Sequence, residues 1–240
     1  MKVYGHRGAL TLAPENTLES YKKAFESGCH GIELDVHLTA DGEVAVIHNF
    51  NTEQACGKHL VIRESTMAQL KELDVVYDFG DKFKGLKIPT LEEVYEFMKD
   101  YPEKDVIVET KGDEIGAPLL ERVVEITKKY RMTHRVIFST ARDSTFKWFN
   151  EKHPDLPVSM LPQTYDDADI SNALSCAGCV AVSPYFGAVD DSFVKKSHDN
   201  NFNVVPWTVN DNDTLKRLVA LGVDGVITNC PALIMEELNK

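Results

Sequence analysis

The sequence predicts an α/β protein folded as a (β/α)8 TIM barrel, with an added β-hairpin arm after the second strand and a short insertion before the second helix. Short β-branched runs alternate strictly with amphipathic helical runs, and each kind occurs eight times. The length of 240 residues is routine for one such barrel. We therefore expect a single domain over residues 1-240, with residues 49-89 as a small insertion. A doubly wound open sheet is the structural alternative, but no glycine-rich phosphate loop follows the first strand.

The individual elements follow from local patterns. Strands are expected where β-branched residues cluster, at residues 3–6, 32–36, 106–110, 136–139, 158–161, 180–183, 204–208 and 226–228. Helical periodicity places helices at residues 17–27, 91–99, 118–130, 143–152, 166–174, 192–200, 213–220 and 232–238, and one more at 67–73 within the insertion. Asn16 with Glu19 resembles a capping box at the start of the first helix, and Gly222 follows the seventh as a helix C-terminal glycine does.

Residues 31–48 predict a β-hairpin that carries polar side chains. Asp41-Gly42 is the strongest short hairpin signal, and a two-residue loop there makes paired positions sum to 83. Asp35 is then expected opposite His48, and Glu33 lies on the same face because side chains alternate along a strand. A solvated polar face of the hairpin would give the same pattern, so the choice between a surface role and a functional site depends on the rest of the chain.

Bulk properties exclude several function classes. A net charge of −12 argues against a nucleic-acid partner, which needs clustered Lys and Arg. No apolar run approaches the roughly 18 residues of a membrane span. The first strand begins by Val3, which leaves no room for a signal peptide, and five cysteines suggest reduced thiols, so we expect a cytoplasmic protein. Cys176 and Cys179 form a C-x-x-C that we interpret as inert, because it lacks a partner motif.

Polar residues recur where the predicted strands end, which is the catalytic edge of a barrel. The residues expected at this mouth are His6, Arg7, Glu33, Asp35, His48, Glu109, Lys111 and Trp207. Trp207, with Tyr185 and Phe186, fits the lining of a substrate pocket, although rim packing explains the latter two equally well.

Three of these residues suggest a metal site. Glu33, Asp35 and Glu109 lie within otherwise apolar strands, and buried like charges need a cation. Oxygen ligands favour one hard divalent cation, Mg²⁺ or Ca²⁺. Lys111 offers an alternative, because its charge could neutralise the cluster without a metal.

Two histidines at the same mouth suit acid–base chemistry on a phosphate ester. His6 or His48 alone would fit a structural role, but together and beside Arg7 and Lys111 they match general acid–base catalysis. Arg7 offers a planar fork for phosphate oxygens and Lys111 a point charge.

With these residues assembled, the chain resembles the glycerophosphodiester phosphodiesterase family nearly from end to end. The motifs that carry the resemblance are Gly5-His-Arg-Gly8, Pro14-Glu-Asn-Thr17, Glu33-Leu-Asp35, Asp41-Gly42 through His48-Asn49, Ile88-Pro-Thr-Leu-Glu-Glu93, Glu109-Thr-Lys111, Trp207-Thr-Val-Asn210 and Gly222-Val-Asp-Gly-Val-Ile-Thr228. The resemblance implies cleavage of glycerophosphodiesters to glycerol 3-phosphate and an alcohol. It also implies His6 and His48 as the acid–base pair and Glu33, Asp35 and Glu109 as metal ligands.

The resemblance further implies phosphate contacts from Arg7 and Lys111, and Glu15 matches a motif position that contacts substrate or braces Arg7. The sequence departs from the family pattern at Asn229 and Asn49, where the family often has aspartate. These departures bear on charge and hydrogen bonding beside the motifs.

The expected chemistry is metal-assisted phosphodiester cleavage. One histidine removes the proton of the attacking hydroxyl and the other protonates the leaving alkoxide, through either a cyclic glycerophosphate or direct attack by water. A lysophospholipase-D-like activity is the nearest rival, but the polar residues of the insertion favour small water-soluble diesters such as glycerophosphocholine. A silent phosphate- or metal-binding module is a second alternative, which loss of either histidine would have signalled. No motif sets head-group preference or oligomeric state.

Overall fold

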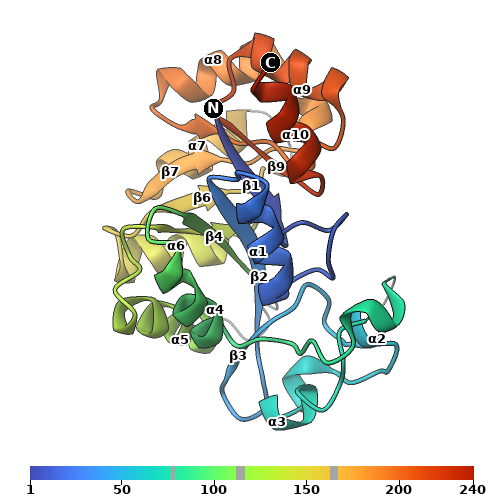
Figure 1. Cartoon of the computed structure of the whole chain (residues 1–240). Coiled ribbons are helices and arrows are strands. Elements are labelled where there is room, and N and C mark those ends of the chain that lie inside the picture. Colours follow the sequence, from blue (N-terminus) through green and yellow to red (C-terminus); the bar gives the residue numbers. More distant parts are fainter. Residues whose placement is uncertain (77–78, 112–116, 163–166) are drawn as a thin grey trace.

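A ring of parallel strands forms the centre of the molecule (Figure 1), and the computed structural model describes residues 1–76, 79–111, 117–162 and 167–240. Strand order in the sheet is β8-β7-β6-β5-β4-β2-β1-β9, with β3 paired to β2 outside the ring. The strands are β1 (Lys2–His6), β2 (Gly31–Leu38), β3 (Val44–Val46), β4 (Asp105–Thr110), β5 (Val136–Thr140), β6 (Val158–Met160), β7 (Cys179–Val182), β8 (Asn203–Val204) and β9 (Gly225–Thr228). This nearly closed barrel of eight parallel strands confirms the predicted fold class.

Backbone hydrogen bonds bridge the seam between β8 and β9. Asp224 N–H donates to the carbonyl of Val204 at 2.9 Å, and Ile227 N–H donates to the carbonyl of Pro206 at 2.9 Å. The predicted strand over residues 204–208 is therefore wrong in extent, because only its first residue lies in β8. Pro206 has no N–H to continue a ladder, which accounts for the early end of the strand.

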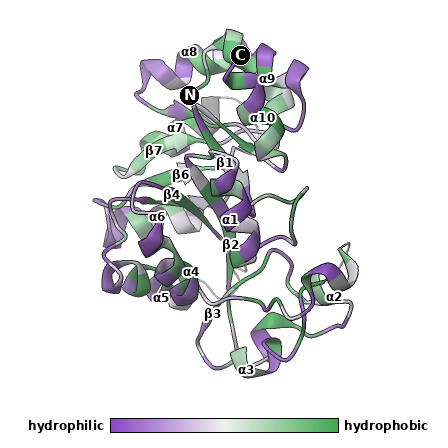
Figure 2. Ribbon diagram, viewed as in Figure 1, coloured by the Kyte–Doolittle hydropathy of each residue, from purple (hydrophilic) through white to green (hydrophobic). Residues whose placement is uncertain are grey.

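Helices surround the barrel (Figure 2), and their buried apolar residues share one large core cluster with residues of the strands. They are α1 (Leu18–Glu26), α4 (Leu91–Phe97), α5 (Ala117–Lys129), α6 (Asp143–Lys152), α7 (Asp167–Leu174), α8 (Asp191–Asp199), α9 (Asn212–Leu221) and α10 (Pro231–Leu238), with the 3-10 turns η3 (Met98–Asp100) and η4 (Phe186–Ala188). These agree with the predicted helices to within a few residues, and Asp166, the predicted start of α7, lies outside the described residues. Within the described part of the chain, every helix is too short or too polar to cross a membrane.

The predicted start of the first helix is wrong in detail. Thr17, rather than Asn16, is the N-cap, and its side chain accepts a hydrogen bond from Ser20 N–H at 3.2 Å. Asn16 instead adopts a positive φ of 54° and directs its amide elsewhere, as described below. The predicted glycine stop is present, because Gly222 caps α9 in the left-handed conformation.

Alternation along the strands separates two kinds of core. Ile32, Leu34 and Val36 of β2 belong to the large apolar layer between barrel and helices, while Glu33 and Asp35 point to the other side of the strand. Inside the barrel, a small apolar cluster of Tyr4, Ile107, Val205 and Ile227 fills the lower part. The polar residues therefore lie on the side of this apolar cluster that faces the carboxyl ends of the strands.

The insertion forms a lobe beyond β3 (Figure 1). Its described elements are α2 (Glu53–Cys56), the 3-10 turn η1 (Ile62–Glu64), α3 (Met67–Leu70) and the 3-10 turn η2 (Gly80–Phe83). Its own core joins Ile62, Met67 and Leu70 to Ala45 and Ile47 of the hairpin arm. The predicted helix over residues 67–73 is present in shortened form as α3.

The hairpin exists, but its predicted register is wrong by one residue. Val36 pairs with Val46 and Leu38 with Val44, so paired positions sum to 82 rather than 83. The loop has three residues and only Gly42 has a positive φ, at 80°. Asp41 keeps an ordinary φ because its carboxylate accepts hydrogen bonds from Thr39 Oγ1 at 2.6 Å and from Met67 N–H at 3.0 Å.

The corrected register places Ile47, not His48, opposite Asp35, and Ile47 N–H donates to the Asp35 carbonyl at 3.0 Å. A one-residue slip would turn His48 to the other face if the ladder continued. The ladder ends here instead, and His48 reaches the barrel mouth from the segment after β3.

Candidate active site

A tight turn after β1 positions His6 and Arg7. Gly8 N–H donates to the Gly5 carbonyl at 3.1 Å, and Arg7 and Gly8 have φ values of 52° and 94°. A Cβ atom on Gly8 would lie 2.3 Å from Ser20 Oγ, so only glycine fits there. The turn directs the Arg7 N–H to Glu33 Oε2 at 3.1 Å and ties the loop to the carboxylates.

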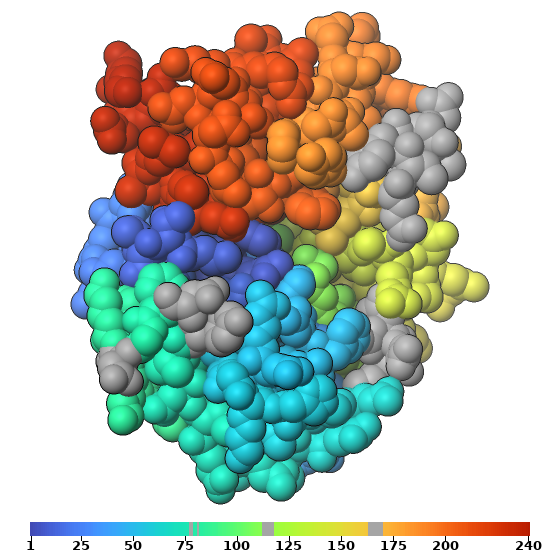
Figure 3. Space-filling view, turned by 90° about the vertical axis from the view of Figure 1, so that its right-hand side faces the viewer, coloured from blue at the N-terminus to red at the C-terminus, as the bar shows by residue number. Residues whose placement is uncertain are grey.

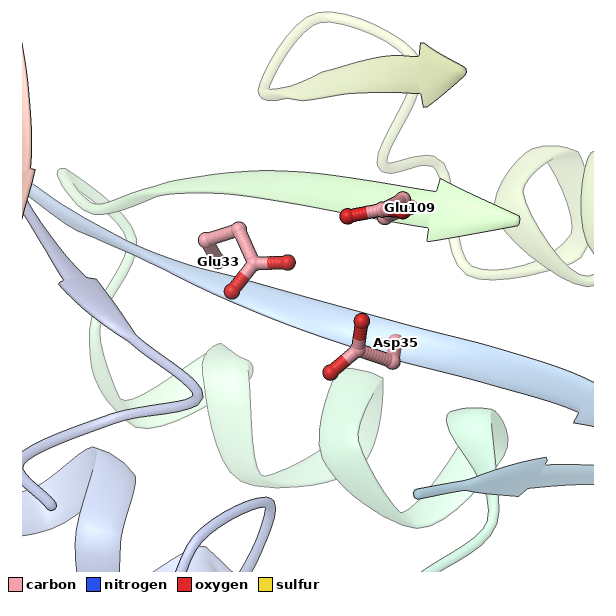
Figure 4. A group of neighbouring side chains, drawn as sticks. All are labelled: Glu33, Asp35 and Glu109. Carbon is pink, nitrogen blue, oxygen red and sulfur yellow. The ribbon is translucent and has the colours of Figure 1, made fainter. Parts of the chain in front are cut away.

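Glu33 and Asp35 of β2 and Glu109 of β4 point their carboxylates into a common space (Figure 4). One oxygen from each lies within 4.8 Å of the others. The strand register explains the proximity, because Asp35 is the parallel partner of Glu109 and Glu33 is the partner of His6. Glu33 and Asp35 are buried, with 4% and 1% of their surface exposed.

Two basic side chains approach this cluster. Arg7 Nη1 bonds Glu15 Oε2 at 2.9 Å, and its Nε lies 3.3 Å from Asp35 Oδ2. Lys111 Nζ lies 3.3 Å from Asp35 Oδ1 and forms a close hydrogen bond with Glu109. Burial opposes both positive charges, but the facing carboxylates outweigh it and raise the pKa values of Arg7 and Lys111, so both remain cationic.

The carboxylates respond differently to burial. Burial and the neighbouring Asp35 and Glu109 raise the pKa of Glu33 well above its ordinary value. Burial also raises the pKa of Glu109, although Lys111 opposes this. For Asp35, Lys111 and Arg7 outweigh burial and lower the pKa. Asp35 is therefore the most firmly ionised of the three carboxylates, whereas the negative charge of Glu33 is the least stabilised by nearby cations.

The donor set fits a divalent cation. Among the described residues, four carboxylates, counting Glu15, face the two cations Arg7 and Lys111, which leaves an excess of two negative charges when all four are ionised. Glu33 Oε1 is buried and has no hydrogen-bond partner among the described residues. A hard cation of charge two would satisfy both the charge and the orphaned oxygen. Lys111 alone cannot, because its ammonium is engaged by Asp35 and Glu109.

The predicted histidines line the same cavity. His6 Nε2 lies 3.9 Å from Glu33 Oε2, and both His6 and His48 border the space beside the carboxylates. Burial, aided by Arg7, lowers the pKa of His6 to about 4. Burial and the cations Arg7 and Lys111 also lower the pKa of His48, although Asp35 opposes them. Without a bound ligand both imidazoles are neutral near pH 7.

The cavity has a volume of about 120 Å³. Figure 3 shows one face of the molecule, on which the N-terminal segment (blue), the insertion (cyan to green) and the C-terminal part of the chain (orange to red) meet. Trp207 borders the cavity and is fixed by a hydrogen bond from its Nε1 to the Ser183 carbonyl at 2.8 Å. The cavity is lined by His6, Arg7, Glu33, His48, Glu109, Lys111, Ser139, Leu161, Trp207 and Ile227. The Tyr185 ring contacts the rings of Trp207 and Phe186, but neither Tyr185 nor Phe186 belongs to the cavity lining.

Sequence reasoning missed residues that support the site. Asn16 Nδ2 donates to Asp35 Oδ2 at 3.0 Å, and its Oδ1 accepts from Tyr21 OH at 3.0 Å. Asn229 Oδ1 contacts His6 Nδ1 at 2.6 Å. Asn16 belongs to the Pro14–Thr17 motif, but its position before the first helix was interpreted as a helix cap rather than as a contact with the site. Cys176 and Cys179 are free, and burial raises the pKa of both thiols, which agrees with an inert pair.

Acidic, basic and imidazole groups that converge at the carboxyl edge of a parallel barrel place the chain among the barrel enzymes. The model of the glycerophosphoryl diester phosphodiesterase family matches residues 6–233, and the chain belongs to this family. It is 32% identical to a glycerophosphodiester phosphodiesterase of Caldanaerobacter subterraneus subsp. tengcongensis, with 99% of this chain and 98% of the relative covered. The enzyme class expected from the sequence is thereby confirmed.

Solved structures agree with the fold. A putative glycerophosphoryl diester phosphodiesterase of Silicibacter pomeroyi superposes with a TM-score of 0.87 at 28% identity, covering 100% of this chain and 94% of the other. A phosphodiesterase of Oleispira antarctica has a TM-score of 0.91 at 23% identity, covering 100% of this chain and 97% of the other.

Proposed function

We propose that this enzyme hydrolyses small glycerophosphodiesters, such as glycerophosphocholine and glycerophosphoethanolamine, to sn-glycerol 3-phosphate and an alcohol. We further propose one bound Mg²⁺ or Ca²⁺, held by Glu33, Asp35 and Glu109, and acid–base catalysis by His6 and His48. The observation that carries the proposal is that both imidazoles and a carboxylate cluster with a net negative charge border one cavity. The relative from C. subterraneus bears the corresponding enzyme name, and the O. antarctica structure holds the product sn-glycerol-3-phosphate.

The cationic side chains would bind and orient the phosphate. Arg7 borders the cavity, and its planar guanidinium can donate to phosphate oxygens. Lys111 borders the cavity just after β4 and adds a point charge. Glu15 holds Arg7 through its Nη1 and thereby fixes the guanidinium plane. We assign Glu15 to bracing Arg7 in the substrate site.

The histidines would move the protons. When bound, the divalent cation supplies positive charge that offsets the charge developing on the phosphoryl group. One imidazole takes the proton of the attacking hydroxyl, which belongs to water or to the glycerol of the substrate. The other gives a proton to the departing alkoxide oxygen, so that the alcohol leaves neutral. Trp207 closes one side of the cavity beside the substrate.

The size of the cavity favours a small substrate. About 120 Å³ is well below the roughly 300–1,000 Å³ of pockets that enclose drug-sized ligands. A phosphoglycerol group with a short alcohol suits this space better than a long acyl chain. All five cysteines are free, which suits a reducing compartment, and we propose the cytoplasm as the location of this activity.

A panel of diesters tests the proposal. With Mg²⁺ or Ca²⁺ present, release of sn-glycerol 3-phosphate is measured from glycerophosphocholine and glycerophosphoethanolamine, and release of lysophosphatidic acid is measured from lysophosphatidylcholine. We expect turnover of the first two and much slower cleavage of the third. Absence of product from every diester with either ion would refute the enzyme proposal, and a preference for lysophosphatidylcholine would establish the lysophospholipase-D alternative. His59→Ala is the matched control variant, because His59 is exposed and lies in the insertion.

A further inference from the structure

The two cavity histidines share one feature on the side away from the carboxylates. Nδ1 of His6 lies 2.6 Å from Oδ1 of Asn229, and Nδ1 of His48 lies 2.8 Å from Oδ1 of Asn49. The two asparagines come from unrelated places, one after β9 and the other after β3. An amide oxygen can only accept a hydrogen bond, so each facing ring nitrogen must carry the proton.

Both asparagines are held by contacts that do not involve the histidines, Asn229 through its backbone and Asn49 through its side-chain amide. The Asn229 N–H donates to Asn210 Oδ1 at 2.9 Å, and the Asn229 carbonyl accepts from Thr11 N–H at 3.3 Å. Asn49 Nδ2 donates to Gln54 Oε1 at 2.6 Å, which determines that its oxygen, not its nitrogen, faces the imidazole. The Asn49 amide is therefore oriented independently of His48, and the Asn229 backbone is fixed where its side chain meets His6.

The His48 ring is also anchored through its own backbone. The carbonyl of His48 accepts a hydrogen bond from His37 Nε2 at 3.0 Å, which fixes the main chain at the point where it leaves the ladder. With backbone and Nδ1 both held, Nε2 is the remaining ring nitrogen. For His6 the same nitrogen points toward the carboxylate cluster, 3.9 Å from Glu33 Oε2.

We propose that Asn49 and Asn229 are positioning residues that keep the Nδ1 proton on both imidazoles throughout the reaction, so that protons enter and leave only at Nε2. The inference rests on the proposed acid–base function of His6 and His48. At the base, the hydroxyl O–H bond breaks and its proton joins Nε2. The acid takes up a proton at Nε2 from solvent when the anionic substrate is bound; this Nε2–H bond then breaks and the proton joins the leaving oxygen. The Nδ1–H to Oδ1 hydrogen bond persists in both charge states, so neither ring must rotate.

The amide has an advantage over a carboxylate at these positions. It orients the ring without adding a charge, whereas aspartate would bring another negative group to a cavity that already has an excess of carboxylates. The two asparagines thus orient the histidines without changing the net charge around the cation site.

Imidazole ¹⁵N chemical shifts test the inference without requiring activity, because the two neutral tautomers give different shifts at Nδ1 and Nε2. Protein labelled with ¹⁵N-histidine is examined as wild type, Asn229→Leu and Asn49→Leu, with the signals assigned from His6→Gln and His48→Gln. We expect the Nδ1–H tautomer for both residues in the wild type. Asn229→Leu should shift only His6 toward the Nε2–H form, and Asn49→Leu should shift only His48. A wild-type Nε2–H tautomer, or unchanged spectra in the leucine variants, would overturn the proposal.

Kinetics provide a second readout. Each leucine variant should lower kcat about 10–100-fold, the usual cost of losing an outer partner that orients a functional histidine, with a much smaller change in KM. Asn229→Asp and Asn49→Asp retain the acceptor and should restore both the tautomer and most of kcat. Asn203→Leu is the matched control, because its amide bonds the Val180 carbonyl near the start of β8, away from the cavity. Equal losses in leucine and aspartate variants would contradict a positioning role.

Failure of the two proposals can be told apart. If wild-type protein releases no sn-glycerol 3-phosphate, the proposed function fails while the tautomers can still be measured. If wild-type protein is active but the leucine variants keep full kcat, the positioning inference fails while the function stands.

Discussion

Replacement of Glu33 by glutamine should make the metal-free protein more stable. Glu33 is buried, and its Oε1 has no hydrogen-bond partner among the described residues. Glutamine keeps the shape and an oxygen that can accept from the Arg7 N–H, while its amide group can donate to Asp35 or Glu109. Leaving a buried polar group unsatisfied costs about 1–3 kcal/mol, and Glu33→Gln should recover a stabilisation of that order at neutral pH.

The gain should depend on pH in a defined direction. Burial and two neighbouring carboxylates raise the pKa of Glu33, so the folded protein holds this proton more tightly than the unfolded chain does. The contribution of Glu33 to stability therefore falls as pH rises above its unfolded pKa of about 4.3. Glutamine has no proton to lose. The advantage of the variant should be small near pH 4 and should increase toward pH 7.

The assay is thermal unfolding of wild type and Glu33→Gln in chelator, from pH 4 to pH 8, with and without a divalent cation. For a chain of this size, about 2–4 °C in Tm corresponds to 1 kcal/mol, so the metal-free variant should melt roughly 2–12 °C higher at pH 7. A cation at about 100 times its Kd should stabilise the wild type by about 2.7 kcal/mol, and the variant much less.

Two results would refute this reasoning. The metal-free variant could melt below the wild type at pH 7, or the cation could raise Tm equally in both proteins. Glu103→Gln is the matched control, because the Glu103 side chain is 65% exposed and precedes β4, whereas Glu109 lies near the other end of that strand. That substitution should leave Tm and the cation response nearly unchanged.

The remaining predictions concern the acid–base pair, the central carboxylate and the turn after β1. His6→Ala and His48→Ala should each lower kcat by about 10²–10⁴-fold, measured as initial rates of sn-glycerol 3-phosphate release. Asp35→Asn should reduce the free energy of unfolding by about 1–3 kcal/mol, measured in denaturant, because the half-buried Arg7 and Lys111 lose their shared charged partner. Gly8→Ala should destabilise the protein far more than Gly85→Ala, again in denaturant, because both have φ near 94° but only at Gly8 does an added Cβ clash.

Controls and contrary outcomes differ for each prediction. His59→Ala should keep full activity, and an equal loss there would show that the assay reports general damage. Asp74→Asn removes a more exposed ion pair with Lys87 and should be much less destabilising than Asp35→Asn. Equal destabilisation by the two alanine substitutions for glycine would show that backbone conformation, not the clash at Ser20, sets the requirement for glycine.

Much of the fold was predictable because strand and helix periodicities are local. The eight parallel strands and the helices between them follow from repeating patterns of apolar residues, and the structure has them in the predicted order. The extent of β8 was not predicted, because a β-branched run around Pro206 resembles a strand although proline cannot continue the ladder. The apolar periodicity of the sequence does not report the missing backbone N–H of a proline.

The hairpin shows why a correct motif can yield a wrong register. Asp41-Gly42 indicated the turn, but its loop length depends on the contacts of Asp41 with Thr39 and with Met67, 26 residues away. A long-range contact of this kind has no local signature. His48 still reaches the cavity because the chain leaves the ladder after Ile47, so its placement was right for a reason that the sequence arithmetic did not contain.

The cluster of candidate ligands was predictable because a period of two places Glu33 and Asp35 on one side of β2, and parallel pairing brings Glu109 beside them. The partners of the histidines were not, since Asn229 is 223 residues from His6 and meets it only through closure of the barrel. Hydrogen bonds between distant loops need the folded backbone before they can be inferred.

The most direct test of the central claim is a titration of Mg²⁺ or Ca²⁺ into chelator-treated protein while sn-glycerol 3-phosphate release from glycerophosphocholine is followed. We predict no release without the ion, and a saturable return of activity with one ion bound per chain that Glu33→Gln greatly weakens. Release at the full rate in the presence of chelator, or an identical titration by Glu33→Gln, would contradict the assignment of Glu33, Asp35 and Glu109 as the cation site.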